Sequence, residues 1–265
     1  MSAADDELTD DQLARYARHV ILDEVGEEGQ LALLHSKVLV VGAGGLGSPV
    51  LLYLAAAGIG HLGIVDFDVV DITNLQRQII HTTDDVGEAK VASAVEKIEA
   101  LNPDIEITGH RDRLSAANAM DLLARYDMIV DGSDNFTSRH LVNDACFFLK
   151  KPLVSAALVR FEGQLSTYRA FENDNPCYRC VFPDPPDADL VPRCDTVGIF
   201  GSIAGVMGTM QATEVLKELL GLGTGLVGQL LLYDALDQTM RKIRVKRDPN
   251  CALCGDKPTI TGVGD

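Results

Sequence analysis

Residues 37–66 read KVLVVGAGGLGSPVLLYLAAAGIGHLGIVD, and this stretch decides the fold class. The run 37–41 is short, apolar and β-branched, and it meets glycines at once, which is typical of a buried parallel strand that feeds a tight turn. We expect an apolar helix over 46–57, ended by Gly58, and a second strand over 61–66. The stretch therefore predicts a β-α-β unit.

Strand and helix patterns continue to alternate as far as residue 156, which favours a Rossmann-type, doubly wound and mostly parallel sheet. The expected helices cover 87–101, 116–124 and 137–149, and the expected strands cover 105–108, 128–130 and 152–156. We interpret the chain as one domain with three parts. These are an N-terminal helical segment (1–36), a nucleotide-binding Rossmann-type part (37–157) and a C-terminal part (158–265) that carries an antiparallel extension.

Both ends of the chain depart from this alternation. Thr9 and Gln12 have the spacing of a capping box and predict an N-terminal helix. The C-terminal part is expected to contain an antiparallel strand over 164–169, a loop rich in Pro, Asp and Cys over 174–192, a helix capped by Thr196 and stopped by Gly221, and a hairpin of 230–233 with 242–245.

Acidic residues outnumber basic residues 39 to 23, and the formal net charge is -16. This charge argues against nonspecific binding to nucleic acid or to an anionic membrane, and it is typical of a halophilic or merely acidic cytosol. The N-terminus is acidic and polar, unlike a signal peptide. The apolar stretch 197–210 is too short to span a bilayer. We therefore expect a cytoplasmic protein.

Gly42, Gly44 and Gly47 form a G-x-G-x-x-G motif between the first expected strand and helix. Glycines at this point let the backbone approach a phosphate at a helix N-terminus. Asp66 follows about twenty residues later, where an acidic side chain can hydrogen-bond ribose hydroxyls. These features alone favour a nicotinamide dehydrogenase, and the alternative is a glycine turn that only packs helix on strand.

Polar residues cluster after the second and fourth expected strands, at the edge where α/β folds bind ligands. They are Asp68, Asn74, Arg77 and Gln78 in the connection 67–81, Lys90 at the start of the next helix, and Asp134 and Asn135 after the strand at 128–130. Two cations and an acid around a glycine loop suit a triphosphate with Mg²⁺ better than a nicotinamide. A surface salt bridge would account for any one of these residues alone, but not for all of them together.

Five segments together resemble the adenylyltransferases that activate ubiquitin-like proteins: RYARHVIL (15–22), GAGGLG (42–47), DFDVVDITNLQRQ (66–78), DVGEAK (85–90) and DGSDNFTSR (131–139). The most similar groups are the molybdopterin-synthase and thiamine sulfur-carrier adenylyltransferases and the archaeal ubiquitin-like activating enzyme. The resemblance implies contacts with ATP or Mg²⁺ from Gly45, Asp66, Thr73, Asn74, Leu75, Gln76, Arg77, Lys90, Asp134 and Asn135. It also implies that Arg18 reaches the phosphates from the second subunit of a homodimer.

The reaction implied by this resemblance is adenylation of a small ubiquitin-like sulfur-carrier protein that ends in Gly-Gly. The carrier carboxylate attacks the α-phosphate of ATP and expels pyrophosphate, while Arg77, Lys90 and Arg18 neutralise phosphate charge and Asp134 holds Mg²⁺. Sulfur from a separate persulfide donor, or Cys194, then displaces AMP. The product can serve molybdopterin synthesis, transfer-RNA thiolation, thiamine synthesis or protein conjugation. The rival hypotheses are an NAD-dependent dehydrogenase and a non-catalytic scaffold that binds partners.

Cys177, Cys180, Cys251 and Cys254 form two C-x-x-C pairs, each with the spacing that a tetrahedral zinc needs. Four sulfurs leave no open position, so we expect a structural Zn²⁺ that joins the loop to the C-terminal tail. The alternative is two redox pairs.

The two other cysteines receive different predictions. Cys146 lies in an apolar helix, where a free cysteine is usually an inert small hydrophobe. Cys194 follows Arg193 and precedes a helix expected to start at Thr196, and both neighbours would lower its thiol pKa. Cys194 is therefore the candidate nucleophile, and the alternative is an incidental surface thiol.

Overall fold

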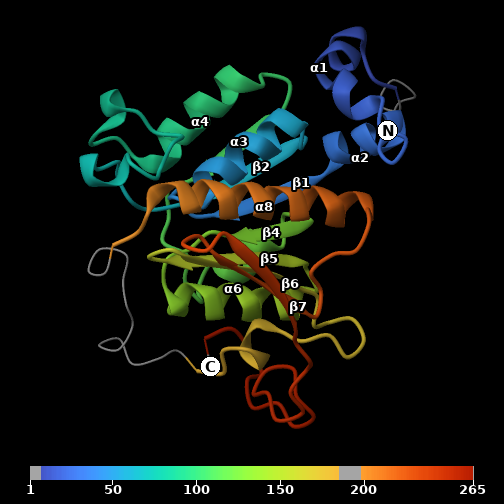
Figure 1. The fold of residues 1–265 in the computed structure, drawn as a ribbon, viewed down its shortest axis with the longest axis vertical. Helices are drawn as coiled ribbons and strands as arrows, with labels where there is room; N and C mark the ends of the chain where they lie inside the picture. The colour runs from blue at the N-terminus through green and yellow to red at the C-terminus, as the bar shows by residue number, and fades with distance from the viewer. Residues whose placement is uncertain (1–6, 185–197, 265) are drawn as a thin grey trace.

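The computed structural model describes residues 7–184 and 198–264 and contains, within them, one eight-stranded sheet (Figure 1). In spatial order the strands are β3-β2-β1-β4-β5-β6-β7-β8. Their bounds are β1 Lys37–Val41, β2 His61–Val65, β3 Glu106–His110, β4 Met128–Asp131, β5 Leu153–Val159, β6 Glu162–Tyr168, β7 Gln229–Asp234 and β8 Thr239–Arg244.

Strands β1 to β5 are parallel in the order 3-2-1-4-5, and β6, β7 and β8 add an antiparallel extension beside β5. The predicted Rossmann-type sheet with an antiparallel C-terminal part is confirmed. Strand order reverses between β1 and β4, and this switch point is where open α/β sheets bind their ligands.

Helices cover both faces of the sheet (Figure 1). Their bounds are α1 Asp10–Val20, α2 Gly26–His35, α3 Gly47–Ala57, α4 Lys90–Leu101, α5 Ala119–Leu123, α6 Phe136–Leu149 and α8 Gly201–Leu220. Apolar side chains of α3, α4 and α8 share one buried cluster with alternate strand residues, and those of α5 and α6 share a second cluster on the other face.

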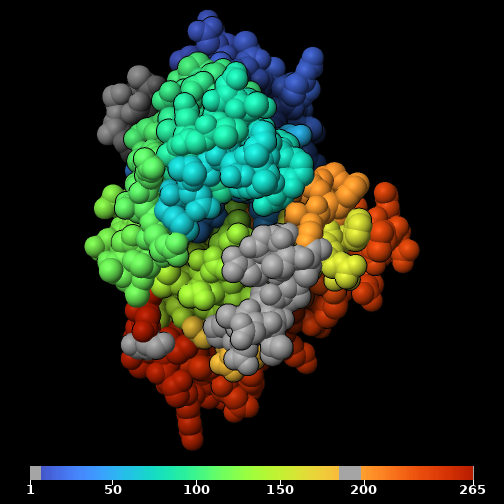
Figure 2. Space-filling model, turned by 90° about the vertical axis from the view of Figure 1, so that its left-hand side faces the viewer, coloured from blue at the N-terminus to red at the C-terminus, as the bar shows by residue number. Residues whose placement is uncertain are grey.

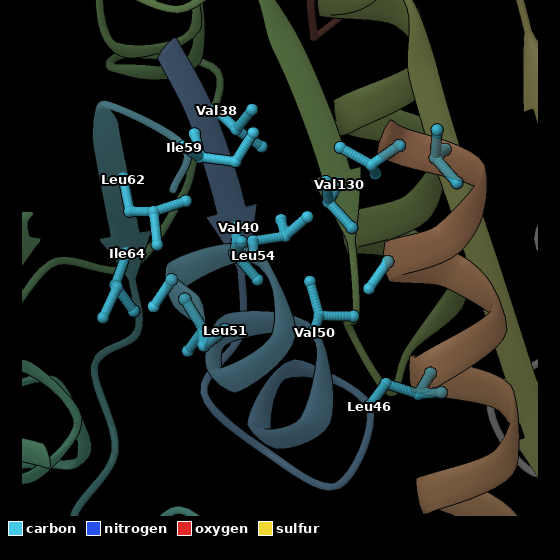
Figure 3. Close-up of a cluster of buried hydrophobic side chains, with 14 of the residues drawn as sticks. Val38, Val40, Leu46, Val50, Leu51, Leu54, Ile59, Leu62, Ile64 and Val130 are labelled. Carbon is cyan, nitrogen blue, oxygen red and sulfur yellow. The ribbon is translucent and has the colours of Figure 1, made fainter. Parts of the chain in front are cut away.

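Strand β1, which is buried from Val38 to Val41, shows how the two cores are built. Val38 and Val40 point into the first cluster, with Val50 and Leu54 of α3 (Figure 3). Leu39 belongs to the second cluster, because successive strand side chains point to opposite faces. A strand segment buried on both sides must be apolar, which explains the sequence VLVV that follows the exposed Lys37.

The N-terminal helix α1 packs at the far end of α3 from the glycine loop. The predicted capping box is present, with the Thr9 hydroxyl and the Gln12 amide oxygen each accepting a backbone N–H. Tyr16 lies against Gly58, where a Cβ would come within 2.6 Å of the tyrosine ring. The Asn102 amide at the end of α4 donates to the Tyr16 hydroxyl. Both contacts fix α1 at the C-terminal ends of α3 and α4.

Several element boundaries differ from those predicted. Helix α4 begins at Lys90 rather than at residue 87, because Glu88 and Ala89 pair with the chain at Val69 and Val70. Helix α5 has five residues rather than nine. Helix α8 begins at Gly201, whereas the predicted cap Thr196 lies outside the described residues.

Strand β8 forms one edge of the sheet, and all six of its residues are exposed. It carries Arg241, Lys242 and Arg244 in an otherwise acidic chain. None of the described helices combines the length and apolar composition that a bilayer span requires.

Candidate functional site

The glycine loop between β1 and α3 is closed so tightly that it accepts no side chain at two positions. Gly42 has φ +95°, in the left-handed region that favours glycine. A Cβ on Gly47 would lie 1.9 Å from the carbonyl oxygen of Gly42. The N–H groups of Gly44, Gly45 and Leu46 have no acceptor in the described part of the chain. Free N–H groups at the start of an 11-residue helix form an anion site.

Asp66, directly after β2, ties the glycine loop to the next segment. One carboxylate oxygen accepts the N–H of Ala43 at 2.8 Å, and the other accepts the N–H of Asp68 at 2.9 Å. Asp68 in turn pairs with Lys90, whose Nζ lies 3.1 Å from a carboxylate oxygen of Asp68. The Lys90 residue is 5% exposed. The structure therefore brings a buried cation to the same edge as the loop, as predicted from the sequence.

In the segment 71–78, the side chains of Arg77 and Gln78 lie beside the glycine loop. The Arg77 guanidinium donates to the Thr73 carbonyl and to the Gln76 side chain, and the Gln78 amide donates to Asn74. A Cβ on Gly45 would lie 3.5 Å from Cγ of Arg77. The side-chain oxygen of Gln78 is buried and has no partner in the described chain. Leu75 is half-buried beside them.

The loop after β4 lies beside the glycine loop at the switch point. A Cβ on Gly42 would lie 3.2 Å from the Gly132 carbonyl oxygen. Asn135 caps α6 by accepting the N–H of Ser138 at 2.8 Å, and its amide donates to Asp134 at 3.3 Å. The Asp134 residue is exposed, so its carboxylate remains open to a cation. Asp131, in contrast, is buried and occupied by Ser133 and Ser155.

These segments border a hollow on one face of the molecule. Figure 2 shows it between the cyan segment after β2, the green chain around β4 and the orange start of α8. The start of α8 touches the polar segment, because a Cβ on Gly201 would lie 2.3 Å from the Gln76 carbonyl oxygen.

His81 is a buried site residue that the sequence did not reveal. Its Nε2 lies 2.9 Å from the carbonyl oxygen of Ala43, and its Nδ1 lies 2.8 Å from the Ser93 hydroxyl. Burial lowers the pKa of His81 below its usual value. A single histidine between two motifs has no spacing signal, so sequence reasoning passed over it.

Among the described residues, Arg18 is the one predicted phosphate contact that the chain does not bring to its own glycine loop. It is exposed on α1, two residues after Tyr16, which contacts Gly58 at the end of α3. The glycine loop lies at the opposite end of α3, where Gly47 begins the helix. This helix has 11 residues and is therefore about 16 Å long.

The four cysteines of the two C-x-x-C pairs converge on one point. All four Sγ atoms lie within 4.8 Å of one another. The measured separations include 3.6 Å for Cys177 with Cys251 and 3.4 Å for Cys180 with Cys254. A tetrahedron of Zn–S bonds of about 2.3 Å places its sulfurs about 3.8 Å apart, so this set fits Zn²⁺.

Helix α6 anchors the first cysteine pair. Arg179, between Cys177 and Cys180, donates to both carboxylate oxygens of Asp144 at 2.8 and 2.7 Å. Asn143 accepts the N–H of the adjacent Tyr178 at 2.8 Å. The four-cysteine cluster is therefore held against α6, a helix that begins next to Asp134.

Cys146 is buried in α6, and burial raises its thiol pKa well above the usual value. Such a thiol is unreactive, which agrees with the prediction of an inert residue. Cys194, the predicted nucleophile, lies outside the described residues.

A glycine loop at the switch point of a parallel sheet, flanked by a buried lysine and an open aspartate, defines a nucleotide-binding α/β protein. The ThiF family profile matches residues 16–253. The chain belongs to the ThiF family, and the family predicted from the five sequence segments is confirmed.

Curated relatives extend over most of the chain. It is 49% identical to a sulfur carrier protein adenylyltransferase of Thermus thermophilus, over 95% of this chain and 94% of that protein. It is also 49% identical to the SAMP-activating enzyme E1 of Haloferax volcanii, over 92% and 90%. The adenylyltransferase and sulfurtransferase MOCS3 of Sus scrofa is 48% identical, and there the chain spans 56% of the relative's length.

Solved structures share the fold. The crystal structure of Escherichia coli MccB with ATP superposes with a TM-score of 0.80 and covers 96% of this chain and 77% of that chain. At 22% identity this likeness supports the fold alone.

Proposed function

We propose that the chain uses ATP to adenylate the C-terminal glycine carboxylate of a small ubiquitin-like sulfur-carrier protein. The observation that carries this proposal is the buried Lys90 beside a glycine loop in which the N–H groups of Gly44, Gly45 and Leu46 have no acceptor among residues 7–184 and 198–264. A nicotinamide dinucleotide needs no such cation, whereas transfer to a phosphate is mainly charge neutralisation and positioning. The names of the relatives support the carrier as the second substrate.

In the proposed reaction an ionised carboxylate oxygen of the carrier attacks the α-phosphorus of ATP, and pyrophosphate leaves with the electrons of the broken P–O bond. The attacking group carries no proton, so no general base is required. The loop N–H groups orient the phosphates, and Arg77 and Lys90 stabilise the charge that develops on them. Asp134 would hold Mg²⁺, which neutralises phosphate charge when bound.

The remaining parts of the proposal follow from this reaction. One adenylating domain contains the nucleotide part 37–157 and a carrier-binding part 158–265. A separate protein supplies sulfur as a persulfide, whose outer sulfur displaces AMP and forms an acyl disulfide with the carrier. A second thiol of the donor protein then attacks the inner sulfur, forms a disulfide with it and releases the carrier thiocarboxylate. Zn²⁺ on the four cysteines is structural. Free thiols and thiolate ligands need a reducing compartment, so we place the protein in the cytoplasm.

The test is ATP–pyrophosphate exchange with and without a ubiquitin-like protein that ends in Gly-Gly. Exchange should require this protein and should vanish when its last glycine is deleted. Absence of exchange with ATP bound would favour a scaffold, and tight binding of NAD in place of ATP would favour a dehydrogenase.

Cys194→Ala should leave exchange within about twofold of the unchanged chain, because a later acyl transfer does not enter the adenylation equilibrium. If Cys194 displaces AMP, the substitution should abolish the thioester seen on non-reducing gels. Cys146→Ala is the matched control and should change neither measurement. A thioester that persists in Cys194→Ala would exclude Cys194 as the nucleophile.

We further propose that Arg18 acts in the site of a partner subunit of a homodimer. The exposed position of Arg18 near the far end of α3 supports a contribution in trans. Arg18→Ala should lower exchange by about a hundredfold, as expected for loss of one charge-stabilising donor.

Mixing Arg18→Ala with Lys90→Ala tests the trans arrangement. After subunit exchange, half of the dimers are mixed and one site in each is intact, so about a quarter of the activity should return. No recovery from the mixture would place Arg18 in its own subunit's site or outside both.

A further inference from the structure

The two peptide groups on either side of the Ala43 Cα are each held by one hydrogen bond. The N–H of Ala43 donates to Asp66 at 2.8 Å, and the carbonyl of Ala43 accepts from Nε2 of His81 at 2.9 Å. In a planar trans peptide, the N–H of the next residue points opposite to the carbonyl. The N–H of Gly44 therefore points away from His81, and it has no acceptor within the described ranges 7–184 and 198–264.

The imidazole ring of His81 is itself fixed. It is 5% exposed, and its Nδ1 lies 2.8 Å from the Ser93 hydroxyl. The carbonyl of Ala43 can only accept, so we assign the proton to Nε2, and Nδ1 of the neutral ring accepts from Ser93. Ser93 lies on α4, one turn after Lys90. The ring thus joins the glycine loop to the turn that carries the buried cation.

We propose that His81 is a positioning residue, which aims the N–H of Gly44 at a phosphate of ATP and sets the loop's distance from Lys90. This inference rests on the proposed function, because it assumes a nucleotide triphosphate in the loop. A preorganised N–H contributes most when negative charge develops on the oxygen that it faces. Loss of His81 should therefore affect the reaction step as well as ATP binding.

Two amide substitutions separate this role from simple filling of space. The amide nitrogen of glutamine can occupy the place of Nε2, whereas that of asparagine reaches only the place of Nδ1. His81→Gln keeps a donor for the Ala43 carbonyl, and His81→Asn removes it. Both remove the aromatic ring, so losses of packing should be similar in the two variants.

The readouts are the dissociation constants of ATP and adenosine and the kinetics of exchange. His81→Asn should weaken ATP binding by about tenfold, the loss expected for one hydrogen bond to a charged group, and leave adenosine within about threefold. Its kcat for exchange should fall by about tenfold to a hundredfold, with a smaller change in the KM of the carrier. His81→Gln should recover most of both losses.

Equal losses in the two amide variants, or parallel weakening of ATP and adenosine, would overturn the positioning role. Ser93→Ala provides a variant that keeps the ring. It should weaken ATP selectively by a smaller factor, because the ring is freed to take the other tautomer, and unchanged ATP affinity would count against the proposal. Failure of the unchanged chain to bind ATP would instead refute the proposed function, so the two failures are distinguishable.

Discussion

Lys90→Ala should lower the rate of carrier-dependent ATP–pyrophosphate exchange by about a thousandfold or more. The ammonium group is buried beside the glycine loop, and a buried cation stabilises developing phosphate charge more than an exposed one does. Folding should tolerate the change, because Asp68, the acid left behind, is half exposed to water. Exchange kinetics at saturating ATP, together with thermal unfolding, measure both effects.

Lys97→Gln is the matched control on the same helix. Lys97 pairs with Asp85 and Glu96, two turns beyond Lys90, and takes no part in the loop contacts described above. Exchange should stay within about twofold of the unchanged chain once stability is allowed for. If both lysine substitutions lowered the exchange rate equally, the effect of Lys90→Ala would come from a change in the charge or stability of α4 and not from the position of Lys90.

Loss of one cysteine from the four-cysteine site should release the C-terminal tail and allow it to unfold. Cys251→Ser should reduce bound zinc from one ion per chain to well below one and lower stability by more than about 4 kcal/mol. For a domain of this size the loss corresponds to a fall in Tm of roughly 8–16 °C. Metal analysis and thermal unfolding of the purified protein measure the two quantities.

Cys146→Ala is the control for this prediction, since Cys146 is buried in α6 outside the cluster. Its zinc content should remain at one ion per chain, and it should cost only the small packing loss of a truncated side chain. If zinc-free protein and zinc-loaded protein unfolded at the same temperature, the proposed structural role of the metal would be wrong.

The sequence was sufficient where local chemistry and backbone geometry coincide. The glycine loop was predictable because Gly42 and Gly47 stand at the two positions where the tight turn admits no side chain. The four cysteines were predictable because two C-x-x-C pairs suit only a few structures. The mostly parallel, doubly wound sheet was predictable from the alternation of strands and helices.

Contacts between distant segments could not be predicted in the same way. His81 acquires its place only when α4 and the glycine loop meet. The pairing of Arg179 with Asp144 joins residues that are 35 positions apart. Helix α2 lies within the segment 1–36 that was predicted as helical, but its two glycines obscure its bounds. The start of α4 was placed too early, because only the folded chain pairs Ala89 with Val69.

The exposed edge strand β8 also bears on how copies of this chain behave at high concentration. An open edge offers unpaired N–H and C=O groups to any strand that meets it, and this is a common route to polymerisation. Here the edge presents Arg241, Lys242 and Arg244, so two edges that approach one another bring like charges together. At molar salt concentration, dissolved ions screen this repulsion at separations beyond a few ångströms. The charge repulsion that opposes pairing of two β8 edges in dilute buffer is therefore lost in concentrated salt.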